Sequence, residues 1–212
     1  MSRSSLWVMN EKYEGKRVLE FSNSWLFSPI VWEVLLDKYM HNEIQTPYGY
    51  KKSLILNHEL TVPLNEKINS CNRLPDRICW EMSNQQTFFT RDKEMVAQNI
   101  RDFITLNEDF DTNSKGLCPL KGEHIISRFN EIADSILCLN EGEAPYFIFK
   151  CTSCDDGVEF WFSRYDEEED KYRRRSLDEV DKHVTEFVMI DNGIIEGFQS
   201  NVKYFKDCGV DD

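Results

Sequence analysis

The chain's densest aromatic stretch reads Pro145-Tyr-Phe-Ile-Phe-Lys-Cys151, and a second such run follows shortly after it, Val158-Glu-Phe-Trp-Phe-Ser-Arg-Tyr165. Both runs are rich in aromatic and β-branched residues, which is typical of strands. The polar segment 152–157 between them contains a glycine, as hairpin turns often do. We therefore predict that residues 146–151 pair antiparallel with residues 158–165. Aromatic residues at successive positions also predict that both faces of the first strand are buried.

The sequence on the N-terminal side of this stretch predicts a further hairpin and three helices. Short apolar runs joined by a polar, glycine-containing turn predict an N-terminal hairpin formed by residues 6–9 and 17–21. Apolar residues recur at helical spacing in three segments, 29–41, 91–106 and 120–139, and the last has the strongest pattern. Residues 53–90 contain only short apolar pieces interrupted by prolines, and no element is assigned there.

The sequence on the C-terminal side predicts two helices. Ser176 and Glu179 have the spacing of a capping box, which predicts a helix that buries Phe187 and Val188. A second helical pattern starts at Ile194 and ends at Gly209. The order of elements does not alternate as in a doubly wound parallel sheet. We therefore expect an α+β fold in which mainly antiparallel strands, including an N-terminal hairpin and a C-terminal aromatic hairpin, pack with about five helices.

Composition points to a folded protein of a reducing compartment. The chain has 212 residues, of which 41% are hydrophobic and 13% aromatic, enough to form a sizeable core. It has no apolar run of membrane-spanning length and no secretory signal at its N-terminus. Its seven cysteines are odd in number and irregularly spaced, and no Asn-x-Ser/Thr sequon occurs. These features predict a soluble, cytoplasmic protein that is not associated with membranes.

The net charge of −13 is unevenly distributed along the chain. Residues 1–106 carry 13 acidic and 13 basic side chains, whereas residues 107–212 carry 25 acidic and 12 basic ones. This change predicts a charge-balanced α+β part followed by an acidic helix-hairpin-helix-helix part, either as two units or as one continuous domain. The excess of acid disfavours direct binding to nucleic acid, while its asymmetry favours an oriented encounter with a basic surface.

The first functional hypothesis is therefore a non-enzymatic binding protein that blocks or recruits a basic protein partner, such as a nucleic-acid-binding enzyme. Immunity proteins and phage counter-defence inhibitors act in this way as a class. The carboxylates expected to form the binding surface are Glu131, Asp134, Glu167, Glu168, Glu169, Asp170, Asp178 and Asp181. An equally simple interpretation is that the net charge only keeps the protein soluble.

A second hypothesis is a zinc-stabilised adaptor. Cys151 and Cys154 have the C-x-x-C spacing that binds zinc, with Cys118 and His124, or Cys138, as further ligands. The chain has no second C-x-x-C pair, so the favoured interpretation is that these cysteines are ordinary small residues of a strand end and a turn, with no cofactor.

The third hypothesis is an enzyme whose site is assembled from residues scattered along the chain. The sequence contains no nucleophile elbow, no phosphate-binding glycine loop and no pair of histidines at zinc-protease spacing. Asp76, which follows Pro75, is interpreted as a helix cap. A pocket with carboxylates of perturbed pKa would favour the enzyme hypothesis.

Overall fold

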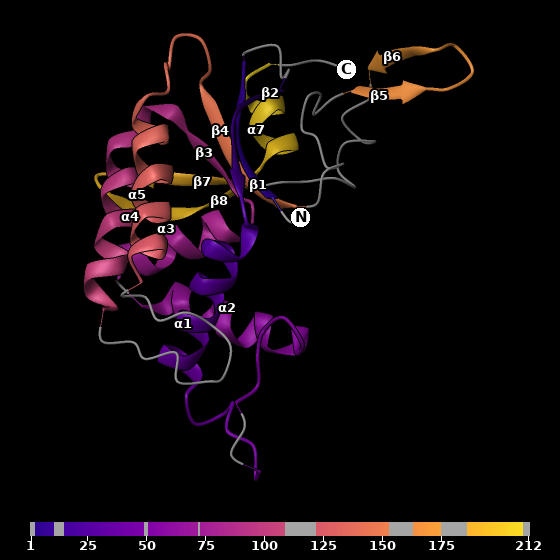
Figure 1. Cartoon of the computed structure of the whole chain (residues 1–212). Coiled ribbons are helices and arrows are strands. Elements are labelled where there is room, and N and C mark those ends of the chain that lie inside the picture. The colour runs from indigo at the N-terminus through magenta and orange to yellow at the C-terminus, as the bar shows by residue number, and fades with distance from the viewer. Residues whose placement is uncertain are drawn as a thin grey trace.

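The computed structural model describes residues 3–10, 15–48, 51–71, 73–108, 122–152, 163–174 and 186–209. In these residues the fold is α+β, with one six-stranded sheet and helices packed on it (Figure 1). No helix in this part of the chain has the length and apolar character needed to cross a membrane.

The strands form a large sheet and a small one. The large sheet has the order β2-β1-β4-β3-β7-β8, and the small one pairs β5 with β6. Among the described residues every strand pairing is antiparallel except that of β3 with β7. The strands are β1 (Arg3–Met9), β2 (Gly15–Ser22), β3 (Thr87–Phe89), β4 (Tyr146–Thr152), β5 (Ser163–Asp166), β6 (Lys171–Arg174), β7 (Glu186–Asp191) and β8 (Ile194–Ser200).

Helices α1, α4 and α5 confirm the periodicity seen in the sequence. The helices are α1 (Ser28–Met40), α2 (Thr61–Ser70), α3 (Leu74–Ser83), α4 (Lys93–Leu106), α5 (Glu123–Leu137) and α7 (Asn201–Asp207), with short 3₁₀ turns η1 (Ser24–Leu26), η2 (His58–Leu60) and η3 (Thr90–Asp92). The N-terminal hairpin and helices α1, α4 and α5 lie where the sequence predicts them. Helices α2 and α3 occupy the stretch that the sequence left unassigned.

The predicted aromatic hairpin is wrong in its pairing, although its first strand is present. β4 pairs along its whole length with β1, from Arg3↔Thr152 to Met9↔Tyr146. Its other edge pairs with β3, for example at Thr87↔Ile148. Both edges of β4 are thus occupied by segments distant in the sequence. Residues 153–162 lie outside the described part, and β5, which follows them, pairs with β6 instead.

The C-terminal helices are also corrected. Phe187 and Val188 belong to strand β7, and the rest of the helix predicted from Ser176 falls on residues 175–185, which the structure does not describe. Residues 194–200 form strand β8 rather than the start of a helix. The reason is the turn at Asn192 and Gly193, whose φ angles of 48° and 76° suit the tight hairpin turn that an Asn-Gly pair favours. Among the residues described from 186 to 209, only those of α7 form an α-helix.

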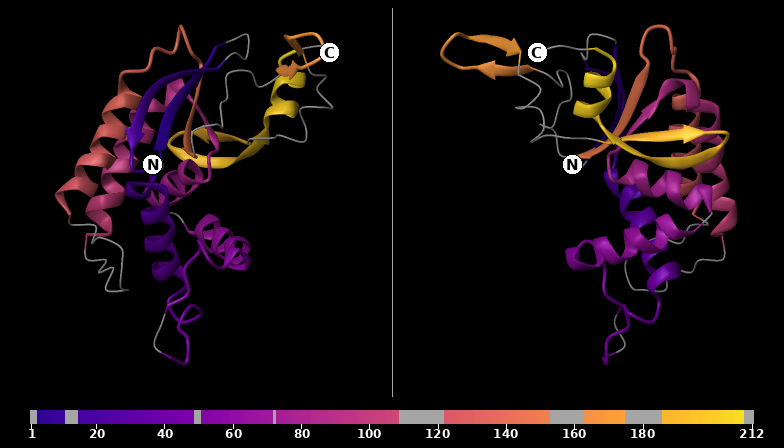
Figure 2. Two further views of the ribbon diagram at one scale, coloured as in Figure 1. Left: turned by 45° about the vertical axis from the view of Figure 1, so that its right-hand side comes forward. Right: turned by 180° about the vertical axis from the view of Figure 1, so that it is seen from behind.

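Two different layers cover the faces of the sheet (Figure 2). On one face Phe149 packs against Phe27, with ring centroids 5.0 Å apart, in the main core beneath the helices. On the other face Tyr146 lies 5.2 Å from Phe187 and 5.9 Å from Tyr204 of α7. The prediction that both faces of β4 are buried is thereby confirmed.

Replacing Phe149 with alanine is expected to lower the free energy of unfolding by about 3–5 kcal/mol, because the ring is fully buried and its removal leaves a cavity. The matched control is Val18→Ala on edge strand β2, where the side chain is 46% exposed and the loss should stay below about 1 kcal/mol. Urea unfolding measures both values. Equal losses would contradict the central position of β4.

Candidate functional site

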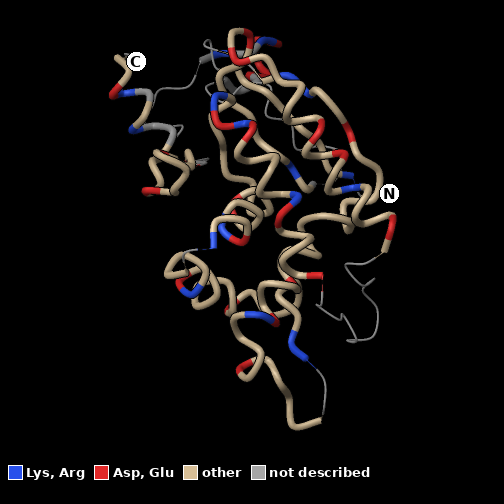
Figure 3. The backbone as a smooth tube through the Cα atoms, turned by 90° about the vertical axis from the view of Figure 1, so that its left-hand side faces the viewer, with Lys and Arg blue, Asp and Glu red and all other residues tan. Residues whose placement is uncertain are grey.

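Helices α4 and α5, together with the residues that flank them, carry a large excess of acidic side chains. The two helices pack side by side on one face of the sheet, and Figure 3 views the molecule from their side. Residues 93–108 and 122–145 carry eight acidic and three basic side chains. Seven of the acidic side chains are exposed, namely Glu94, Glu108, Glu123, Glu131, Asp134, Glu141 and Glu143. Glu108 follows α4, and Glu141 and Glu143 follow α5. We call these seven residues the acidic face.

The three basic side chains of this region are engaged within the molecule. Arg101 forms an ion pair with Asp134. Arg128 forms one with Glu131 at 3.0 Å and also donates to the main-chain oxygen of Ser22 at 2.7 Å. Lys93 donates to the main-chain oxygen of Leu139. These contacts offset part of the negative charge and leave a clear excess of carboxylates on the acidic face.

The structure separates the carboxylates that the sequence grouped into one surface. Glu131 and Asp134 lie three residues apart on the outward side of α5. Residues 167–170 form the exposed turn between β5 and β6, which Figures 1 and 2 draw on the opposite side of the sheet from α5. Asp178 and Asp181 lie outside the described residues. Among the described residues, the predicted carboxylates therefore form two separate groups, the pair on α5 and the four in the β5–β6 turn.

The described part of the chain contains only some of the predicted zinc ligands. Cys151 lies in β4, with its sulfur 3.6 Å from the main-chain oxygen of Ser24. Cys154 and Cys118 fall outside the described residues. His124 and Cys138 lie at opposite ends of α5, about 20 Å apart along the helix. Where residues are described, no group of three or more His, Cys, Asp and Glu side chains is placed to hold a metal ion.

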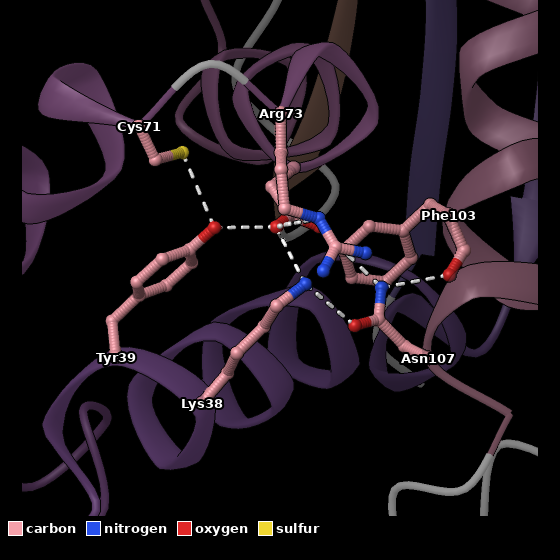
Figure 4. A network of polar contacts seen from close by, with 7 residues as sticks. Lys38, Tyr39, Cys71, Arg73, Phe103 and Asn107 are labelled. Carbon is pink, nitrogen blue, oxygen red and sulfur yellow. Dashed lines mark hydrogen bonds and ion pairs between the residues drawn. The ribbon is translucent and has the colours of Figure 1, made fainter.

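A buried polar network around Asp76 was not anticipated from the sequence (Figure 4). The Asp76 carboxylate has no exposed surface. Lys38 Nζ and Tyr39 Oη both donate to its Oδ2 at 2.6 Å, and Arg73 Nε lies 3.4 Å from the same oxygen. Asn107 Nδ2 donates to Oδ1 at 3.4 Å. The network thus connects α1, the start of α3 and the end of α4.

The hydrogen bonds of this network hold α1, α3 and α4 together. Both carboxylate oxygens of Asp76 already accept hydrogen bonds, so the group has little capacity left to act as a base or a ligand. Burial and the hydrogen bond to Asp76 raise the pKa of Tyr39, which keeps the phenol protonated and able to donate. The Tyr39 hydroxyl also lies 3.2 Å from Cys71 Sγ. We assign the network a structural role.

A second unexpected feature is a pair of poorly satisfied charged groups on α3. Glu81 is 4% exposed, and its Oε1 has no hydrogen-bond partner in the described part of the chain. Arg77, one helical turn earlier, donates from Nη1 to the main-chain oxygen of Ile195 at 3.3 Å, while its buried Nε has no acceptor there. Burial, with a smaller effect of the Glu186 carboxylate, raises the pKa of Glu81 to about 8 against the opposing effect of Arg77.

Comparisons with known proteins add no further constraint. The chain was compared with protein-family models, with curated proteins and with solved structures, and none of the three gave a match. Functional inference therefore rests on the residues and their geometry.

Replacing Asp76 with alanine is expected to cost about 3–5 kcal/mol of unfolding free energy, because it leaves Lys38 and Arg73 without their shared carboxylate. The control is Asp134→Ala, which removes an ion pair from a side chain that is 68% exposed and should cost less than about 1 kcal/mol. Urea unfolding at pH 7 compares the two variants. Similar losses would show that the Asp76 network is no more important than a surface pair.

Glu81 should make the protein less stable as pH rises. Between the ordinary pKa of 4.5 and the folded value of about 8, the folded protein holds a proton that the unfolded chain has released. The free energy of unfolding therefore falls across this window and levels off above it. Glu81→Gln, which mimics the protonated form, should match the wild type near pH 4.5 and exceed it by about 2–4 kcal/mol above pH 8.

The measurement is urea unfolding at several pH values from 4.5 to 9. Glu94→Gln serves as the control because Glu94 is exposed on α4. Its pH profile should run parallel to that of the wild type. A Glu81→Gln profile that also runs parallel would refute the role assigned to the buried carboxyl.

Proposed function

We propose that the protein is a non-enzymatic binding protein that blocks or recruits a basic protein partner through the acidic face of α4 and α5. The proposal rests on the charge of residues 93–108 and 122–145, which carry eight acidic but only three basic side chains. Because Arg101 and Arg128 are held in internal ion pairs, they do not cancel the remaining carboxylates. A rigid surface with one dominant sign of charge favours a partner of the opposite sign.

The mechanism is electrostatic steering followed by docking. α5 presents its carboxylates from a helix whose other side is fixed in the core by Ile125, Phe129 and Ile132. The positions of the charges are therefore set before the partner arrives. Such a field increases the association rate and sets orientation more than it increases affinity. A partner that uses its basic surface to bind nucleic acid would have that surface covered.

The test compares two triple charge reversals that change the net charge equally. One variant changes Glu94, Glu141 and Glu143 to lysine on the acidic face, because these carboxylates form no ion pair among the described residues. The other changes Glu167, Glu168 and Glu169 to lysine in the β5–β6 turn. Affinity purification from the native host with wild-type bait first identifies the partner, and stopped-flow mixing at increasing salt then gives the association rate of each variant.

We expect the acidic-face variant to associate about tenfold or more slowly at low salt and to lose most of its salt dependence. The β5–β6 variant should behave like the wild type. Equal slowing of both variants would leave only a general effect of net charge. Slowing of the β5–β6 variant alone would place the interface there and refute the acidic face. Circular dichroism confirms that each variant is folded.

A further inference from the structure

A hollow of about 350 Å³ lies between α3 and the start of β8. Leu74 and Arg77 line it from the helix, and Gly193, Ile194 and Ile195 line it from the hairpin. The volume is within the range of sites for small organic molecules. The hollow is separate from the acidic face of α4 and α5.

The walls of this hollow are apolar except for one guanidinium. Ile194 is 61% exposed, which is unusual for a large aliphatic side chain, while Ile195 is 4% exposed and belongs to the core. A Cβ atom added at Gly193 would meet nothing within 4 Å, so the hairpin turn leaves open space beside the hollow. Aliphatic walls around a single charged group favour a ligand that combines an apolar body with one charge of opposite sign.

Arg77 has fewer hydrogen bonds than a half-buried guanidinium requires. In the described residues, its side chain makes a single hydrogen bond of 3.3 Å, to the main-chain oxygen of Ile195, and its Nε has no acceptor. An arginine has five N–H donors, and donors removed from water without acceptors are costly. A carboxylate suits this group, because its two oxygens can accept two parallel hydrogen bonds from the terminal nitrogens of one guanidinium.

The charged groups near Arg77 do not neutralise it at neutral pH. Glu81, one turn further along α3, forms no ion pair with Arg77, and its pKa of about 8 keeps it mostly protonated at pH 7. Glu186, at the start of β7, is exposed to water and does not line the hollow. The hollow therefore has a net positive charge from Arg77.

We propose that this hollow binds a small organic carboxylate with an apolar body. The carboxylate accepts hydrogen bonds from Arg77, and the apolar part packs on the leucine and isoleucine side chains that line the walls. Binding supplies acceptors to the guanidinium and covers the exposed Ile194 side chain. This site is independent of the proposed partner-binding function.

The test uses octanoate as the probe, with octylamine as a probe of the same shape and opposite charge. Two-dimensional NMR titration of the whole chain at pH 7 follows the amides of Ile194 and Ile195 and the Arg77 Nε–H signal. We expect octanoate to shift these signals with a dissociation constant on the order of 1 mM or lower. Octylamine should bind at least tenfold more weakly.

Two variants and one control complete the test. Arg77→Gln should weaken octanoate binding at least tenfold. Arg91→Gln should leave it unchanged, because Arg91 lines a different hollow on the other side of the β7–β8 turn. Ile194→Glu, at an exposed position, should also weaken binding and serves if Arg77→Gln does not fold. Equal binding of octanoate and octylamine, unchanged binding by the folded variants, or no shift at Ile194 and Ile195 would overturn the proposal.

Discussion

The fold depends on the position of β4 at the centre of the sheet. Its main chain is hydrogen-bonded to β1 on one edge and to β3 on the other, and residues 147–149 are fully buried. β1 belongs to the first hairpin of the chain, and β3 leads through β7 to the last one. β4 therefore lies between the strands from the beginning and those from the end of the chain. Because its edges and faces are all covered, it cannot move without disturbing both layers of the protein.

The helical layer on one face of β4 combines apolar packing with a polar clamp. Phe27 and Phe129 connect α5 and the start of α1 to the sheet through ring contacts. Such ring contacts keep the side chains buried but allow the helices to shift along the sheet. The Asp76 network fixes the relative positions of the helices, because a buried carboxylate must keep its hydrogen-bond donors on α1 and at the end of α4. The same helices then present the acidic face outward at fixed positions.

Sequence patterns predicted the helices that bury a single continuous stripe, such as α5, and the strand character of residues 146–151. They did not predict the partners of that strand, because strand composition reports burial and not which distant segment supplies the neighbouring strand. The aromatic run at 158–165 lies nearby in the sequence, but β4 pairs with β1 and β3 instead. α3 escaped detection because it buries Asp76 and Glu81 among its apolar residues, which obscures the helical period. The partners of Asp76 come from α1, α2–α3 and α4, so no local spacing reveals them.

The β7–β8 hairpin is attached to the sheet differently from the other strands. β7 pairs in parallel with β3 at the single register position Thr87↔Phe187, whereas β1 and β4 pair at seven positions. A short parallel ladder contributes little by itself. Side chains therefore determine how firmly the hairpin is held, through the ring contacts of Phe187 with Phe89 at 5.1 Å and Tyr146 at 5.2 Å and through the hydrogen bond from Arg77 to the main-chain oxygen of Ile195. Because Arg77 provides one of these attachments, any anion that engages its guanidinium also acts on the position of the hairpin. The proposed carboxylate site lies next to this short parallel ladder, so ligand binding there would couple to the local order of the hairpin.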